Sequence, residues 1–128
     1  RNLMEARGYQ HEIDETISAV KRLREVGVRI LIGGDYGLSI TPHGSNAKDL
    51  QYFVDLFEMS PAEALLCATR DGGLAFDPTG MLGTLEQETA ADLVIIDGDP
   101  IDDIAVLQDA DRMVGVMKAG VLHDDLLR

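Results

Sequence analysis

The feature that most constrains the fold is a mostly apolar run from Val28 to Ile32 that leads directly into Gly33-Gly34-Asp35. The run is rich in β-branched residues and shows no regular polar alternation, which predicts a strand buried on both faces of a sheet. Such strands belong to parallel α/β folds, where ligands bind beyond the carboxyl ends of the strands. Asp35 therefore stands where such a sheet would present a functional side chain.

Helical periodicity flanks this strand on both sides. Apolar residues at three- and four-residue steps predict a helix over 11–26, which Gly27 would end. A second helix is predicted over 47–57, with Asn46 as its cap. A third begins at Ser60-Pro61, where Glu63 completes a capping box, and runs to about residue 70.

After Gly72-Gly73 the pattern changes to short strands and turns. We expect turns around a short strand over 77–90, a strand over 92–97, a helical turn over 101–108 and a hairpin whose turn is Lys118-Ala119-Gly120. The first part of the chain thus reads as one turn of an alternating α/β fold, and the last part as a separate β layer.

Length and charge exclude several classes of protein. The 128 residues suffice for one domain but are short of the ~250 of a complete β/α barrel. A net charge of −12 argues against nucleic-acid and anionic-membrane partners, and no apolar run is long enough for a membrane span. The lone Cys67 rules out an internal disulfide, is expected to pack in a core, and favours a cytoplasmic location.

Two polar residues near the predicted strand end are candidates for chemistry. Asp35 is placed to bind a metal ion or to act as a general base, although a loop carboxylate often only hydrogen-bonds its own turn. His43 follows in the next loop and is read either as a substrate or metal contact or as a surface residue. His11 and His123 have no partner at metal-ligand spacing and are expected to be structural or exposed.

Four motifs, in this order, resemble the amidohydrolase superfamily. Its last barrel strand is similar to residues 28–35, and its "MTPAEAL…AAT" helix is similar to 59–69. Its single "G-x-L-E-x-G-x-x-ADLVVLDGDP" segment is similar to 82–86 together with 91–100, and its terminal "V-x-K-x-G" hairpin resembles 116–120. The Pro42-His43-Gly44 loop resembles the imidazolonepropionase and prolidase branch, so the resemblance covers residues 12–123 and implies the C-terminal portion of such a protein.

The resemblance implies a fold and a division of the chain. We expect an α/β protein in which residues 1–76 are the last strand-helix unit or units of a TIM-like (β/α)8 barrel. Residues 77–128 would supply the C-terminal strands of a small β-sandwich. Partners would be a small-molecule substrate and the remainder of the barrel, on the same or a separate chain, with a homo-oligomer as a further expectation.

The resemblance also implies a metal-dependent hydrolase of C–N bonds in amides, cyclic amides, ureas or dipeptides. Asp35 would be both a metal ligand and the general base toward a metal-activated water, with zinc as the expected metal, one or two ions per site. His43 and Tyr36 would contact substrate.

Departures from the family's pattern limit this reading. The family's H-x-H and later histidines are absent from these residues, so the chain alone is expected to be inactive. A non-catalytic α/β binding or interaction module is therefore the alternative. Gly34 replaces a threonine, which would loosen the loop, and Glu58 and Glu88 stand at glycine positions where a positive φ would cost roughly 1 kcal/mol.

Overall fold

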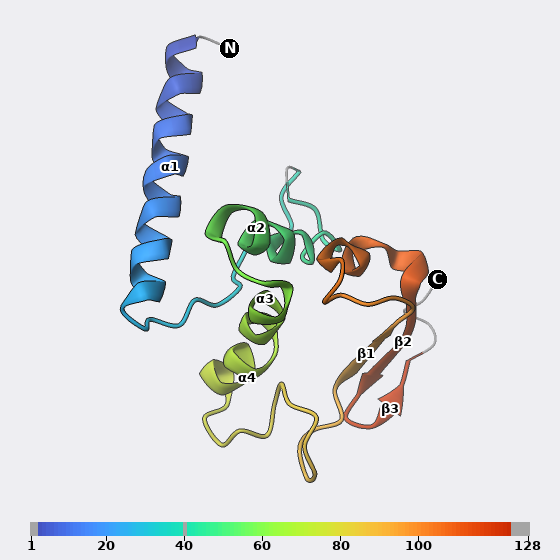
Figure 1. Cartoon of the computed structure of the whole chain (residues 1–128). Coiled ribbons are helices and arrows are strands. Elements are labelled where there is room, and N and C mark those ends of the chain that lie inside the picture. Colours follow the sequence, from blue (N-terminus) through green and yellow to red (C-terminus); the bar gives the residue numbers. More distant parts are fainter. Residues whose placement is uncertain (1–2, 40, 124–128) are drawn as a thin grey trace. The chain divides into compact units, whose positions relative to one another are not determined.

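The computed structural model describes residues 3–39 and 41–123 (Figure 1). Contacts divide the chain into two compact units, residues 1–30 and residues 31–128. The domain boundary predicted between residues 76 and 77 refers to the layers of a complete enzyme and stays a prediction. Within the described ranges, no helix is both long and apolar enough to cross a membrane.

The first unit is built on helix α1, Leu3–Glu25, which begins well before the predicted residue 11. Its end is the predicted one, because Gly27 adopts a φ of 82°. The Val28 amide donates to the Leu23 carbonyl at 2.9 Å, and the Gly27 amide donates to the Arg24 carbonyl at 2.9 Å. This Schellman arrangement satisfies carbonyl groups that the end of a helix would leave unpaired.

The strand predicted over residues 28–32 does not form, and this prediction is wrong for the chain by itself. These residues follow α1 as irregular backbone, and the three strands of the described residues lie elsewhere. The physical reason is that a strand exists only through its hydrogen-bonded neighbours. A parallel strand needs neighbours from distant parts of a chain, and the described residues supply none.

The second unit opens with helix α2, Lys48–Phe57, close to the predicted 47–57. Its N-cap is Ala47, already in a right-handed helical conformation, and no side chain caps it. The expected cap by Asn46 is therefore wrong, because the Asn46 carbonyl instead takes part in the entering turn and accepts from the Asp49 amide at 3.2 Å.

Helix α3, Pro61–Ala68, starts as predicted. The Ser60 hydroxyl accepts from the Glu63 amide at 3.3 Å, and the Glu63 carboxylate accepts from the Ser60 amide at 2.8 Å. This capping box satisfies two of the amides that a helix start leaves without partners. The turn before it places Glu58 at a φ of 56°, the positive value that its glycine-like position implied.

Helix α4, Arg70–Phe76, was not predicted, because Gly72 and Gly73 were read as a helix breaker. The Gly73 amide donates to the Thr69 carbonyl at 2.7 Å, so the backbone continues almost directly from α3. A Cβ built on Gly73 would overlap the carbonyl oxygen of Leu82. This glycine therefore permits a close backbone approach rather than a turn.

The β part is one antiparallel sheet in the order β1-β2-β3. Its strands are β1, Leu93–Ile96, β2, Met113–Lys118, and β3, Val121–Leu122. The 3₁₀ helices η1, Ile104–Gln108, and η2, Ala110–Arg112, link β1 to β2. Helix η1 agrees with the helical turn predicted over 101–108, whereas η2 was not predicted. The predicted β2-β3 hairpin is confirmed, whereas residues 77–90 form turns without the expected short strand.

The core of the second unit lies where α2, α3 and η1 meet. Its buried apolar side chains are Leu50, Phe53, Met59, Ala64, Cys67 and Ile104. The predicted packing role of Cys67 is confirmed, because its Sγ is buried and lies 4.0 Å from Met59 Sδ. This core fixes α2, and with it the loop that precedes α2.

Candidate active site

The loop from Gly33 to Asn46 leads into α2 and carries Asp35, which is exposed. Thr41 closes this loop at three points. Its hydroxyl donates to the Asp35 carbonyl at 2.6 Å, and its own carbonyl accepts from the Gly37 amide at 2.8 Å. Its amide donates to the Leu38 carbonyl at 3.1 Å. The backbone of Asp35 is therefore held although its carboxylate faces solvent.

His43 lies against the same loop. Gly37 adopts a φ of 107°, and a Cβ built there would stand 3.0 Å from His43 Nε2. Both the backbone conformation and the imidazole therefore call for glycine at this position. The structure thus places the His43 imidazole against Gly37, in the turn that follows Asp35.

The Tyr36 side chain points toward the start of α2. Its hydroxyl donates to the Asn46 carbonyl at 3.3 Å. The pKa of Tyr36 is raised to about 12, mainly by burial and secondly by a hydrogen bond with the Asp49 carboxylate. Both groups pack on Gly34, since a Cβ there would overlap Tyr36 Cε2 and lie 2.5 Å from Asp49 Oδ2. Glycine at position 34 thus makes room for this packing.

Sequence reasoning missed Thr41 and Asp49 as members of this site. Thr41 stands in a loop where no motif singles it out. Asp49 belongs to the first turn of α2, where a carboxylate has the ordinary role of facing the positive end of the helix dipole. No sequence spacing links either residue to Asp35, so their part in the site is apparent only from the contacts in the structure.

Asp35 fits one position of a metal site. Its carboxylate is exposed, and carboxylate oxygen is a usual ligand of zinc and other divalent ions. Across residues 3–39 and 41–123, no group of three or more His, Cys, Asp or Glu side chains is arranged to hold a metal ion. Any further ligands would therefore come from outside these residues.

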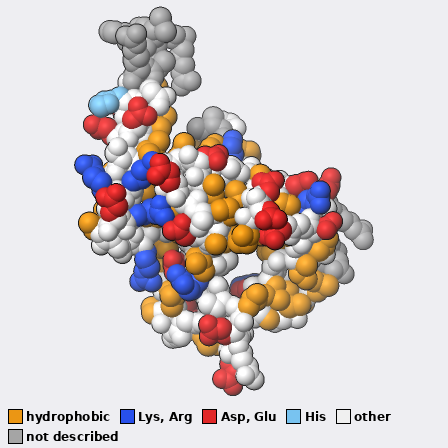
Figure 2. Space-filling view, viewed as in Figure 1, with side chains coloured by type: hydrophobic (Ala, Val, Ile, Leu, Met, Phe, Trp, Pro, Cys, Tyr) orange, Lys and Arg blue, Asp and Glu red, His pale blue; other side chains and the backbone are white. Residues whose placement is uncertain are grey.

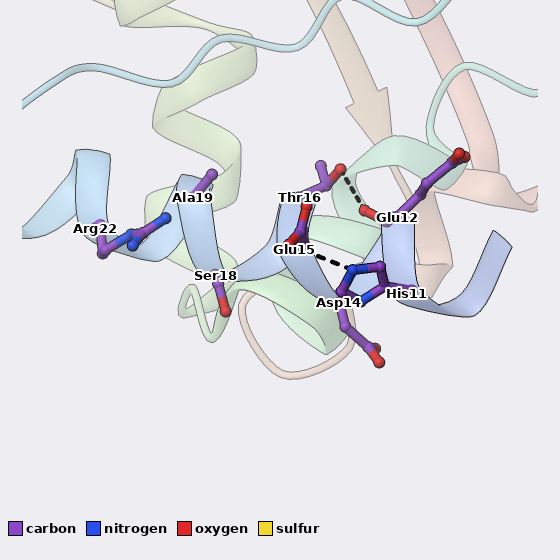
Figure 3. Close-up of a pocket in the computed structure, with 8 residues that line it drawn as sticks. All are labelled: His11, Glu12, Asp14, Glu15, Thr16, Ser18, Ala19 and Arg22. Atoms are coloured by element: carbon purple, nitrogen blue, oxygen red, sulfur yellow. Dashed lines mark hydrogen bonds and ion pairs between the residues drawn. The ribbon is translucent and has the colours of Figure 1, made fainter. Parts of the chain in front are cut away.

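Helix α1 carries a hollow on its surface (Figure 3). All eight residues that line it belong to α1, and two pairs of them interact within the helix. His11 Nε2 lies 3.4 Å from Glu15 Oε1, and the Thr16 hydroxyl donates to the Glu12 carbonyl at 2.8 Å. A single helix face cannot surround a ligand, so Asp35 and its loop remain the candidate site.

Comparison with known proteins shows which proteins the chain is similar to. The chain is 32% identical to ochratoxinase from Aspergillus niger over 110 residues, which are 85% of this chain and 22% of that protein. It is 25% identical to imidazolonepropionase from Thermoanaerobacter pseudethanolicus over 95 residues, 74% of this chain and 23% of that protein. The chain thus spans about a quarter of the length of the curated relatives it matches.

Solved structures give the same result. The structure of A. niger ochratoxinase matches with a TM-score of 0.83 and 28% identity, over 95% of this chain and 27% of that one. A Xaa-Pro dipeptidase with methionine bound in its active site matches with a TM-score of 0.72 and 31% identity, over 84% of this chain and 25% of that one. The model of the amidohydrolase family matches residues 10–122, so this chain belongs to the amidohydrolase family.

Proposed function

We propose that this chain is the C-terminal part of a metal-dependent hydrolase that acts on C–N bonds in amides, cyclic amides, ureas or dipeptides. The observation that carries the proposal is the exposed Asp35 in a self-closed loop, inside the region matched by the amidohydrolase family. Relatives named ochratoxinase, imidazolonepropionase and Xaa-Pro dipeptidase support this reaction class. In this proposal residues 1–76 complete a barrel and residues 77–128 complete a β-sandwich.

The proposed mechanism assigns two roles to Asp35. Its carboxylate binds a divalent metal ion, zinc in our proposal, together with histidines from the rest of the enzyme. When bound, the metal supplies Lewis-acid chemistry, which polarises the scissile carbonyl and lowers the pKa of water. Asp35 accepts the proton of the attacking water on a carboxylate oxygen and passes it to the leaving nitrogen.

His43 and Tyr36 are the two residues proposed to contact the substrate beside Asp35. His43 is exposed and lies on the turn after Asp35, so we propose it as the substrate contact. Tyr36 keeps its proton at any ordinary pH, because its pKa is about 12, and its hydroxyl faces Asn46 and Asp49. Its proposed contact with substrate is therefore through the ring edge and not through a phenolate.

The test is the Asp35→Asn variant of the full-length enzyme. Asparagine keeps the shape of the side chain but cannot take a proton, so kcat should fall by roughly 10²–10⁴, the usual contribution of a general base. Metal content, measured by mass spectrometry, should fall as well. Asp55→Asn is the matched control, because Asp55 is exposed on α2 and only accepts a hydrogen bond from Gln51 at 2.9 Å.

Substrates for the test are a Xaa-Pro dipeptide, an N-acyl amino acid and a cyclic amide. Near-normal turnover by Asp35→Asn would overturn the assigned role of this residue. A full-length protein that binds no metal and hydrolyses none of the three substrates would favour the non-catalytic module instead.

A further inference from the structure

Two anchors hold the backbone at Asp35 and at Tyr36, the residue that follows it. The first is the Thr41 hydroxyl, which donates to the Asp35 carbonyl at 2.6 Å across six residues of sequence. The Thr41 backbone pairs with Gly37 and Leu38, which keeps this hydroxyl in place. A hydrogen bond of this length to a main-chain carbonyl fixes the peptide plane that follows Asp35.

The second anchor acts on the next residue, Tyr36. Its hydroxyl meets the Asn46 carbonyl at 3.3 Å, and its ring packs with the Asp49 carboxylate on Gly34. Asn46 lies in the turn that enters α2 and Asp49 in the first turn of that helix, and Leu50 of α2 is part of the buried core. This anchor therefore connects the Asp35 loop to the most firmly packed part of the second unit.

We propose that Thr41 and Asp49 are positioning residues that set the direction of the Asp35 carboxylate. The proposal rests on the function proposed above for Asp35. Neither residue contacts the reacting atoms: Thr41 acts through the Asp35 carbonyl, and Asp49 acts through Tyr36. Gly34 is part of the same set of contacts, because a side chain at that position would displace Tyr36 and Asp49.

A positioning role for Thr41 and Asp49 predicts how kcat and KM should change when either residue is substituted. Misplacement of a reacting group by about 1 Å can cost on the order of 10²-fold in rate. A general base acts in the transition state and contributes little to substrate binding, so losing its position lowers kcat with little change in KM. A residue with a merely structural role would instead lower the melting temperature and leave kcat intact below it.

The experiment pairs a disruptive and a conservative variant at each anchor of the full-length enzyme. Thr41→Val removes the hydroxyl and Thr41→Ser keeps it. Asp49→Ala removes the acceptor and Asp49→Asn keeps an acceptor oxygen. We expect Thr41→Val and Asp49→Ala to lower kcat by roughly 10- to 100-fold with KM within about twofold, and the conservative variants to stay within about threefold of wild type.

A double-variant cycle then tests whether the anchors act through Asp35. Residues that work as a unit are not additive, so Thr41→Val should cause no further loss in an Asp35→Asn background. Unchanged kcat in both Thr41→Val and Asp49→Ala, or full additivity with Asp35→Asn, would overturn the positioning proposal. Normal turnover by Asp35→Asn alone would instead overturn the proposed function, so the two failures can be told apart.

Discussion

Gly83 and Gly73 mark the places where the α3-α4 junction and the loop that follows α4 approach each other backbone to backbone. A Cβ on Gly83 would overlap the Thr69 carbonyl oxygen, and one on Gly73 would overlap that of Leu82. The two glycines thus allow residues 69–73 and 82–83 to pack in direct backbone contact, one glycine on each segment. This contact joins two of the sequence motifs that resemble the amidohydrolase pattern.

Substituting Gly83 with alanine should destabilise the protein more than the same change at Gly80. Both residues have similar backbone conformations, with φ of 81° and 79°, but nothing lies within 4 Å of a Cβ on Gly80. Gly80→Ala should therefore cost about 1–2 kcal/mol of strain alone, whereas Gly83→Ala adds overpacking of roughly 1–3 kcal/mol. Urea unfolding of the full-length protein measures both, and equal costs would argue against the backbone contact at Gly83.

Single residues were predictable wherever a local rule fixes the backbone. The Ser60 capping box and the Gly27 helix end need only neighbouring residues, and both are observed. The positive φ of Glu88, 69°, was implied by its place in a motif where glycine is usual. The cap by Asn46 failed because the turn before α2 uses the Asn46 carbonyl and not its side chain.

At the scale of elements, the β2-β3 hairpin is clamped to β1 by Asp92. The Asp92 carboxylate pairs with the Lys118 ammonium and accepts from the Ala119 amide at 2.7 Å. The hydrogen bonds from Lys118 and Ala119 hold the pKa of Asp92 below its ordinary value. Ala119 adopts a φ of 50°, so the carboxylate supports a strained turn residue.

The lowered pKa of Asp92 predicts an acid-sensitive hairpin. A carboxylate with a lowered folded-state pKa stabilises the fold above its unfolded value of about 4, and this contribution is lost as pH falls through the folded value. Hydrogen exchange of residues 113–123 should thus show weaker protection in Asp92→Asn at neutral pH, and the difference from wild type should shrink as the pH falls through the lowered pKa of Asp92.

Asp102→Asn is the control for this measurement, since it removes one charge from the loop before η1 and leaves the hairpin intact. A difference between Asp92→Asn and wild type that persisted unchanged into acid would contradict the role of the charged carboxylate.

Among the elements, those with local signals were predicted and those defined by distant contacts were not. Helix α2 and the hairpin follow from periodicity and turn residues within their own segments. Helix α4 was missed because Gly73 serves packing against Leu82, which lies beyond any local window. The strand over 28–32 was predicted from composition, but its formation depends on partners that these residues do not provide.

At the scale of the whole molecule, the second unit leaves large apolar side chains uncovered. Phe76 and Leu85 are each 87% exposed, and Figure 2 shows hydrophobic side chains gathered over the sheet. The sheet contributes Val94, Ile95, Val114, Val121 and Leu122, which are between 47% and 59% exposed. Exposed patches of this kind usually mark a surface that another part of a protein covers.

The 128-residue chain produced alone should therefore self-associate. Its β1 and β3 strands also present sheet edges, which promote pairing between copies. Light scattering after size-exclusion chromatography should find oligomers or aggregates, and co-production with the remainder of the full-length protein should suppress them. A monodisperse monomer with one cooperative melting transition would show that the exposed surface needs no cover.

The closed loop around Asp35 has a consequence for how its sequence can vary. The Thr41 hydroxyl reaches the Asp35 carbonyl only because a fixed number of residues separates the two. Leu38, at the outside of the loop, is 53% exposed, so its identity matters little to that hydrogen bond. An inserted or deleted residue would move the hydroxyl away from the carbonyl. The loop should therefore tolerate a substitution at Leu38 but no insertion or deletion between Tyr36 and Thr41.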